Sequence, residues 1–271
     1  DTVRRFKGPH PDRFIILTRP DWRLLDGSSA SLARRFADCV AEGAQGLKLW
    51  KDLGLTLRDG TGNLVRVNDP RLDPLMSKAG ELGFPVMVHA ADPVAFFDPL
   101  DATNERYEEL LAHPDWQFHG SQFPPFRRII EDLRDLVRRH PKTIFIGAHV
   151  GGYAEKLDYV GGMLRECPNY YVDMSGRVAE LGRQPHAARR FFLEFADRIL
   201  FGLDSFPPTA EAYRVVYRFL ETADEYFDYT ADGLEPQGRW KVYGLDLPDE
   251  VLAKVYYENA GRVFPGANVA G

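Results

Sequence analysis

The chain has 271 residues, of which 44% are hydrophobic and 27% are charged, and its formal net charge at pH 7 is −6. This composition is typical of a globular protein, and the length fits one large α/β domain, so we expect residues 1–271 to form a single domain. The acidic balance argues against a nucleic-acid surface, which needs clustered lysine and arginine. No apolar run approaches the roughly 20 residues of a membrane span.

The two cysteines, Cys39 and Cys167, lie in apolar helical patterns without a C-x-x-C context. We interpret both as reduced core residues, as cytosolic conditions favour. The first stretch, DTVRRFKGPHPDRF, is charged and broken by prolines, unlike a signal peptide. These features predict a cytoplasmic protein.

Six short apolar runs predict β-strands. They are Phe14–Thr18, Gly46–Trp50, the start of Phe84–Pro93, Thr143–Ala148, Asn169–Met174 and Ile199–Leu203. Apolar residues at helical spacing predict helices between and after them, at 32–43, 69–83, 126–137, 157–164, 188–195, 210–226 and 248–265. The RDGTGN sequence between the second and third strands predicts a surface turn.

Strands that alternate with helices predict a parallel sheet. The chain contains neither a G-x-G-x-x-G pattern nor a P-loop, either of which would favour a doubly wound nucleotide-binding sheet. Polar residues at the ends of several different strands favour a barrel, because barrel enzymes carry their chemistry at the carboxyl ends of the strands.

The connection between the third and fourth predicted strands is longer than the others. Its residues 90–125 are rich in proline and aromatic residues, and we interpret them as a lid-like insertion over the rim of the barrel. His119 lies in this insertion. It is a candidate substrate contact, although surface loops also often carry a histidine.

Three predicted strands end in a metal-ligand type of residue, in the order His89, His149 and Asp204. Imidazole and carboxylate groups hold the divalent ions that activate water, usually with one position left open. If the strands close into a barrel, these three side chains converge. The pattern therefore predicts a metal site.

Several stretches carry a family resemblance: GLKLWKDLG, PVMVHAADP, TIFIGAHVGG, NYYVDMSGR, RILFGLDSFP and YYENAGRVF. Through them the chain resembles the amidohydrolase superfamily, in its branch of metal-dependent hydrolases and decarboxylases. The resemblance implies a (β/α)8 TIM-like barrel, with His89 as the strand-5 metal ligand, His149 as the strand-6 histidine and Asp204 as the strand-8 aspartate. It implies a divalent metal ion, with zinc preferred and manganese as the alternative.

The chain departs from the family pattern in one respect. The resemblance places a His-x-His pair on strand 1, and no His-x-His occurs in this sequence. Counting back from the later motifs, Phe14–Thr18 corresponds to strand 3. We therefore expect the first two βα units of the barrel to be missing from the sequence given.

Two further residues are candidates by position. Lys48 lies where some superfamily members carry a carboxylated lysine that bridges two metal ions, so one or two ions are expected; it could equally contact a substrate carboxylate. Arg177 follows the fifth predicted strand, where a guanidinium can bind a carboxylate through two hydrogen bonds or form an ion pair at the rim.

The sequence favours a metal-dependent hydrolase that cleaves an ester, lactone or amide-type bond of a small carboxylated or cyclic molecule. Asp204 would take a proton from water, and His149 or the metal would stabilise the oxyanion. The alternative is non-oxidative decarboxylation of an aromatic or unsaturated acid. A non-catalytic scaffold is the third reading, which the missing His-x-His supports. A small molecule is the expected partner, and a homo-oligomer is left open.

Overall fold

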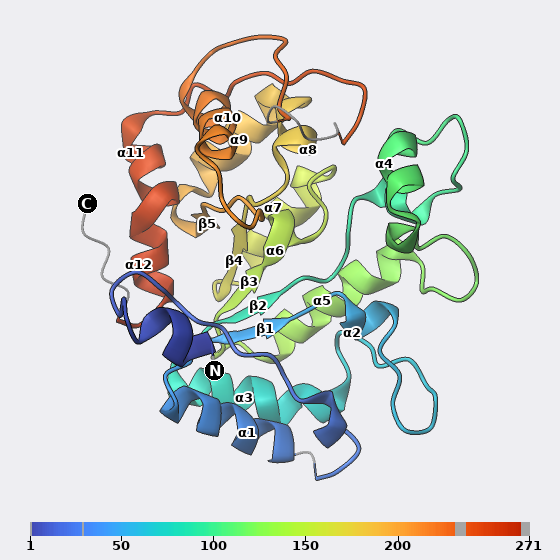
Figure 1. Ribbon diagram of the computed structural model, residues 1–271, viewed down its shortest axis with the longest axis vertical. Coiled ribbons are helices and arrows are strands. Elements are labelled where there is room, and N and C mark those ends of the chain that lie inside the picture. The colour runs from blue at the N-terminus through green and yellow to red at the C-terminus, as the bar shows by residue number, and fades with distance from the viewer. Residues whose placement is uncertain (1, 29, 231–236, 267–271) are drawn as a thin grey trace.

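The computed structural model describes residues 2–28, 30–230 and 237–266 (Figure 1). Five strands form one parallel sheet in the order β1-β2-β3-β4-β5. They are β1 (Leu47–Leu49), β2 (Val86–Val88), β3 (Phe145–Gly147), β4 (Tyr170–Asp173) and β5 (Ile199–Leu200). With helices between consecutive strands, the fold is of the barrel-like α/β type that the sequence predicts. Within the described residues β1 and β5 are the two edges of the sheet.

Helices connect and cover the strands (Figure 1). The α-helices are α1 (Ala30–Ala41), α2 (Asp52–Leu55), α3 (Asp73–Leu82), α4 (Tyr107–Ala112), α5 (Phe126–Arg139), α6 (Ala148–Gly151), α7 (Leu157–Glu166), α8 (Val178–Gly182), α9 (Pro185–Glu194), α10 (Ala210–Glu221), α11 (Asp249–Ala253) and α12 (Asn259–Val263). The 3₁₀ and π segments are η1 (Val3–Lys7), η2 (Trp22–Leu24), η3 (Pro70–Leu72), η4 (Val94–Phe97), η5 (Pro114–Trp116), η6 (Ala196–Arg198) and η7 (Lys254–Glu258).

Alternation along the strands gives the sheet two different faces. Leu47 and Leu49 of β1 lie in the main core, together with the apolar sides of α3, α5 and α7. Lys48, between them, points to the opposite face, where its register partner is Met87. Residues two apart share a face, so His89 continues the row of Met87 beyond the end of β2. The alternation therefore aims Lys48 and His89 at the same side of the sheet.

The first predicted strand is wrong. Of Phe14–Thr18, only Thr18 forms a β-bridge, to Leu47, with Thr18 N donating to the Gly46 carbonyl and Lys48 N donating to Thr18 O. Phe14 and Ile15 are each 37% exposed, and of this run Leu17 packs against a core cluster. An apolar run extends a sheet only where neighbouring backbone pairs with it, and here the pairing is confined to the last residues.

The helix predicted over 210–226 is five residues shorter in the structure. It ends at Glu221, because Thr222 adopts an extended conformation, in which both its backbone N–H and its hydroxyl donate to the Arg218 carbonyl. The predicted helix 248–265 is confirmed as the continuous run α11, η7 and α12 over 249–263. Asn259 in this run donates to the carbonyls of Ala196 and Ile199 and so ties it to β5.

Cys39 and Cys167 are both free thiols, as the sequence predicts. No helix in the described part of the chain has the length and apolar character to cross a membrane.

Gly147 gives the first testable prediction. A Cβ on Gly147 would overlap the Tyr170 hydroxyl and lie 2.8 Å from the Gly151 Cα. Gly147→Ala should therefore lower the free energy of unfolding by about 1–3 kcal/mol, the usual cost of overpacking a core. The measurement is urea unfolding followed by circular dichroism.

Gly162→Ala is the matched control, because a Cβ on Gly162 in α7 meets nothing within 4 Å. This variant should gain up to about 1 kcal/mol from helix propensity. A Gly147→Ala protein as stable as the wild type would contradict the packing described here.

Candidate active site

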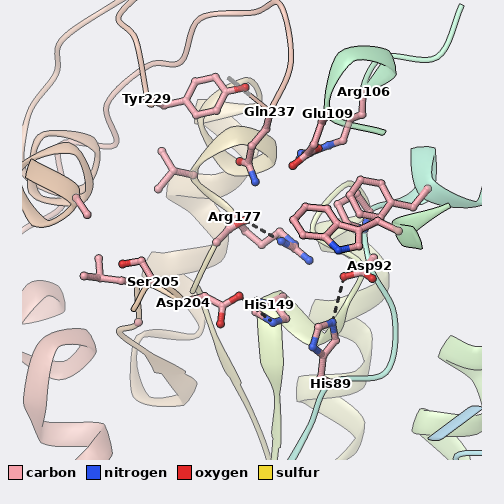
Figure 2. A pocket seen from close by; sticks show the side chains of 18 of the residues that line it. His89, Asp92, Arg106, Glu109, His149, Arg177, Asp204, Ser205, Tyr229 and Gln237 are labelled. Atoms are coloured by element: carbon pink, nitrogen blue, oxygen red, sulfur yellow. Dashed lines mark hydrogen bonds and ion pairs between the residues drawn. The ribbon is translucent and has the colours of Figure 1, made fainter. Parts of the chain in front are cut away.

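A cavity of about 620 Å³ lies where the carboxyl ends of the strands meet (Figure 2). Lys48, His89, His149, Arg177 and Asp204 all line it. Each comes from a strand of the sheet or from the segment that follows one. The structure thus brings together five residues that the sequence singles out, from positions up to 156 residues apart (204 − 48).

His89 and His149 lie at the floor of the cavity, with their rings edge to face and the ring centroids 4.4 Å apart. His89 Nε2 lies 3.2 Å from Asp92 Oδ1, and the other Asp92 oxygen accepts a hydrogen bond from Lys51 Nζ. Burial lowers the pKa of the His89 imidazole, against the opposing effect of Asp92. Burial disfavours the charged form of Asp92, but His89 and Lys51 outweigh it and hold the pKa of this carboxyl well below its usual range.

The backbone of His149 adopts the left-handed conformation (φ 59°, ψ 48°), which is strained for a side chain of this size. The buried carboxylate of Asp173 compensates: its Oδ1 accepts hydrogen bonds from His149 N at 3.1 Å and from Ser175 N at 3.0 Å. The Ser175 hydroxyl donates to the same oxygen. These bonds join the ends of β3 and β4 and turn the imidazole towards the cavity.

Hydrogen bonding also fixes the tautomer of His149. Its Nδ1 lies 2.8 Å from the Ser175 carbonyl oxygen, which can only accept, so Nδ1 carries the proton. Burial, Arg177 and His89 lower the pKa of His149 to about 4, so the ring is neutral at pH 7. The lone pair of Nε2 then faces Asp204 Oδ2 at 3.7 Å. Two acceptor atoms at this distance favour a proton or a cation between them.

Asp204 also has a left-handed backbone (φ 62°), and its side chain is 62% exposed. Of His89, His149 and Asp204, Asp204 is thus the most exposed to solvent. Figure 2 shows its carboxylate directed towards His149.

The cationic side chains of Lys48 and Arg177 also line the cavity. Burial lowers the pKa of the Lys48 ammonium, while the Asp173 and Asp204 carboxylates oppose this shift. Arg177 is buried and lies in the middle of the cavity in Figure 2. Within the described ranges its guanidinium donates to the backbone carbonyl of Gly176, at 2.8 Å, and not to a carboxylate. Its remaining N–H groups are therefore available to an anionic ligand.

The insertion 90–125 supplies an aromatic wall. Phe96 of η4 and Trp116 of η5 line the cavity and stack with their ring centroids 6.1 Å apart. His119, in contrast, is not brought to this cavity. It is exposed, and its ring lies 3.0 Å from the Phe97 carbonyl oxygen, so the structure gives no support to a contact with substrate.

The sequence missed several polar residues of the site: Lys51, Asp92, Arg106 and Glu109 also line the cavity. Asp92 follows His89 by three residues, and the Asp92-Pro93 pair predicts a turn and not a site residue. Arg106 and Glu109 lie in the insertion, where nothing in the local pattern indicates that they face inward.

The donor types fit a divalent metal ion only in part. Neutral imidazoles and a carboxylate are the ligands that zinc and manganese use, and His89, His149 and Asp204 supply them. Among the residues that the structure describes, however, no three His, Cys, Asp or Glu side chains are grouped closely enough to hold a metal, and His89 Nε2 faces Asp92. The described residues therefore provide part of a ligand set.

Comparison with known proteins identifies relatives of this fold. A protein-family model described as Amidohydrolase matches residues 9–266. No curated protein sequence matches the chain.

Solved structures match over nearly the whole chain. The 2,6-dihydroxybenzoate decarboxylase from Rhizobium has 16% identity and a TM-score of 0.60, covering 97% of this chain and 75% of its own. The 5-carboxyvanillate decarboxylase from Sphingomonas paucimobilis has 18% identity and a TM-score of 0.54, covering 97% and 70%. A dihydroxybenzoic acid decarboxylase from Polaromonas, with bound manganese, has 16% identity and a TM-score of 0.61, covering 97% and 73%. At such identities the likeness shows the fold.

The buried, neutral His149 predicts a pH dependence of stability. In the unfolded chain the imidazole binds a proton below about pH 6.5, whereas in the folded chain it does so only below about pH 4. Unfolding takes up a proton between these values, so stability is full above pH 6.5 and falls as the pH drops towards 4. At about 1.4 kcal/mol per pKa unit, the loss reaches about 3 kcal/mol.

His149→Asn is the variant for this test, because asparagine tolerates the left-handed backbone and does not titrate. Urea unfolding of metal-free protein at pH 7 and at pH 4.5 should show a smaller loss of stability in the variant than in the wild type. Equal losses would mean that His149 is not the group responsible.

Proposed function

The chain belongs to the amidohydrolase family, whose model matches residues 9–266, and from this premise we propose that it is a metal-dependent decarboxylase of a small aromatic acid. One observation carries the proposal: a cavity walled by Phe96 and Trp116 holds two cations, Arg177 and Lys48, that form no ion pair within the described part of the chain, whereas Lys51 and Arg106 are paired. That combination suits a carboxylate on an aromatic ring. The activities of the matched decarboxylases, which act on 2,6-dihydroxybenzoate and 5-carboxyvanillate, support the same class.

Substrate binding follows from the chemistry of the lining. The planar Arg177 guanidinium binds a carboxylate through two parallel hydrogen bonds, and Lys48 adds a second positive charge. Phe96 and Trp116 offer ring faces on which an aromatic substrate stacks. Arg177 and Phe96 are themselves buried, which strengthens an electrostatic contact made there.

In the reaction the bond between the ring carbon and the carboxylate breaks and carbon dioxide leaves. The electron pair stays on the ring carbon, which then takes up a proton, so no oxidant is needed. A divalent ion held by His89 and Asp204, among other ligands, would stabilise the negative charge of substrate oxygens. Asp204, exposed to solvent, takes up the proton and holds it at Oδ2, towards which the lone pair of the neutral His149 Nε2 points from 3.7 Å. From there the proton reaches the carbon.

Hydrolysis, which the sequence favours, is the second candidate. The same pair of acceptors, His149 Nε2 and Asp204 Oδ2, suits the removal of a proton from water, and the family model carries the description Amidohydrolase. The aromatic wall and the free guanidinium favour decarboxylation.

The role of Arg177 is tested with Arg177→Met. Losing a charge-assisted pair of hydrogen bonds should lower kcat/KM at least about 100-fold, mainly through KM. Carbon dioxide release from hydroxybenzoates is measured with added manganese or zinc. Arg214→Met, at an exposed position on α10, is the control and should behave as wild type. Ester or lactone cleavage without carbon dioxide release from any aromatic acid would favour hydrolysis instead.

Asp204→Asn tests the proton donor. Asparagine keeps the shape and accepts the left-handed backbone, but it cannot carry the proton. We expect kcat to fall about 10²–10⁴-fold, the usual contribution of a general acid or base, with metal content measured in parallel by elemental analysis. Unchanged kcat at equal metal content would exclude this role for Asp204.

A further inference from the structure

The cavity has an acidic end that the proposed reaction does not use. Arg106, just before α4, is fully buried and forms ion pairs with Glu109 of α4, at 2.6 Å, and with Glu180 of α8. One guanidinium thus faces two carboxylates. Arg106 and Glu109 line the cavity, whereas Glu180 is buried behind them with no exposed surface.

Arg106 holds this trio (Arg106, Glu109 and Glu180) together, because its guanidinium pairs with both carboxylates. Burial opposes the charge on Arg106, but Glu180 and Glu109 outweigh it and raise the pKa of the guanidinium. Burial likewise opposes the charge on Glu180, and Arg106 lowers its pKa. Arg106 also lies over the Phe96 and Trp240 rings, with its Cζ 5.8 and 5.7 Å from their centroids. The trio therefore anchors the insertion to α8, directly after Arg177.

Glu109 is the member of the trio that meets the cavity. Its side chain is 10% exposed, whereas those of Arg106 and Glu180 are 0% exposed. In Figure 2 the Glu109 carboxylate points into the cavity opposite Gln237, at the end away from His89 and Asp204, with Arg177 between the two ends. Arg106 occupies one lone pair of Glu109 Oε2, and a carboxylate offers about four, so acceptor capacity remains.

The two ends of the cavity differ in their polar groups. Lys48 lies at the strand end, on the sheet face that His89 shares. Asp92 and Asp204 accompany the histidines there, Arg106 and Glu109 form the far end, and Arg177 lies between the two ends. An aromatic acid whose carboxylate binds Arg177 brings the opposite edge of its ring towards Glu109. An ionised carboxylate accepts hydrogen bonds and donates none, so it favours a donor on that edge and disfavours an acceptor.

We propose that Glu109 determines substrate specificity by accepting a hydrogen bond from a donor, a phenolic hydroxyl or an aryl amine, on the ring edge remote from the substrate carboxylate. This inference rests on the proposed function. Arg106 and Glu180 are positioning residues. Arg106 pairs with both Glu109 and Glu180, and neither the Arg106 nor the Glu180 side chain has exposed surface.

The test is calorimetric binding of 3- and 4-substituted benzoates to the full chain. The wild type should bind 4-hydroxybenzoate or 4-aminobenzoate, or the corresponding 3-substituted acid, at least about tenfold more tightly than the methyl analogue, as expected for a hydrogen bond to a charged group. The hydroxyl and amine acids together identify which donor the site takes.

Glu109→Leu should reduce this discrimination to less than about threefold, with affinity for the methyl acid little changed. Glu109→Gln, which keeps a neutral acceptor and the shape, should discriminate to an intermediate degree and serves if Glu109→Leu does not fold. Glu108→Leu is the matched control, because Glu108 is the exposed neighbour on α4, paired with Arg239, and should discriminate as wild type.

Three outcomes would overturn the inference: a wild type that binds neither acid or does not discriminate, full discrimination in both Glu109 variants, or equal loss in Glu108→Leu. Carbon dioxide release from the same samples separates the two proposals. Discrimination by Glu109 without any release overturns the decarboxylase assignment alone. Release from hydroxyl and methyl acids with equal KM overturns the role of Glu109 alone.

Discussion

The Asp173 carboxylate is the interaction on which the site depends. A buried carboxylate is costly unless hydrogen bonds compensate, and Asp173 Oδ1 accepts three, from His149 N, Ser175 N and the Ser175 hydroxyl. In return it holds His149 in a backbone conformation that the residue would otherwise leave. With the backbone held in this conformation, His149 Nδ1 meets the Ser175 carbonyl oxygen and Nε2 faces Asp204.

The polar groups that line the cavity come from two parts of the chain, the strand ends and the insertion 90–125. The strand ends supply histidines and cations, and the insertion supplies the aromatic wall together with Arg106 and Glu109, which α8 joins through Glu180. In the function proposed above, the strand ends would carry the reacting groups and the insertion would select the substrate. This division is common in barrel folds, where rigid strands carry the reacting groups and loops vary the specificity.

The strand pattern made part of the site predictable. His89, His149 and Asp204 each follow a predicted strand, and the ends of parallel strands meet at one edge, so their convergence could be expected. The structure brings them to one cavity with Lys48 and Arg177. The sequence did not reveal the trio, since Arg106 meets Glu180 across 74 positions. Nor did the sequence reveal the left-handed backbone at His149, because that conformation is usually predicted from a glycine and this position is a histidine. The strand predicted at Phe14–Thr18 is reduced to a bridge at Thr18, because only the end of this apolar run pairs with the backbone around β1.

The tie between α12 and the sheet has a consequence for biosynthesis. Asn259 and the Val255 carbonyl satisfy backbone groups at the edge of β5, and they belong to the last helical run that the structure describes. On the ribosome every strand of the sheet emerges before that run. The groups at the β5 edge therefore lack these partners until residues 255–259 have been synthesised, and an unpaired strand edge is open to intermolecular pairing during that time.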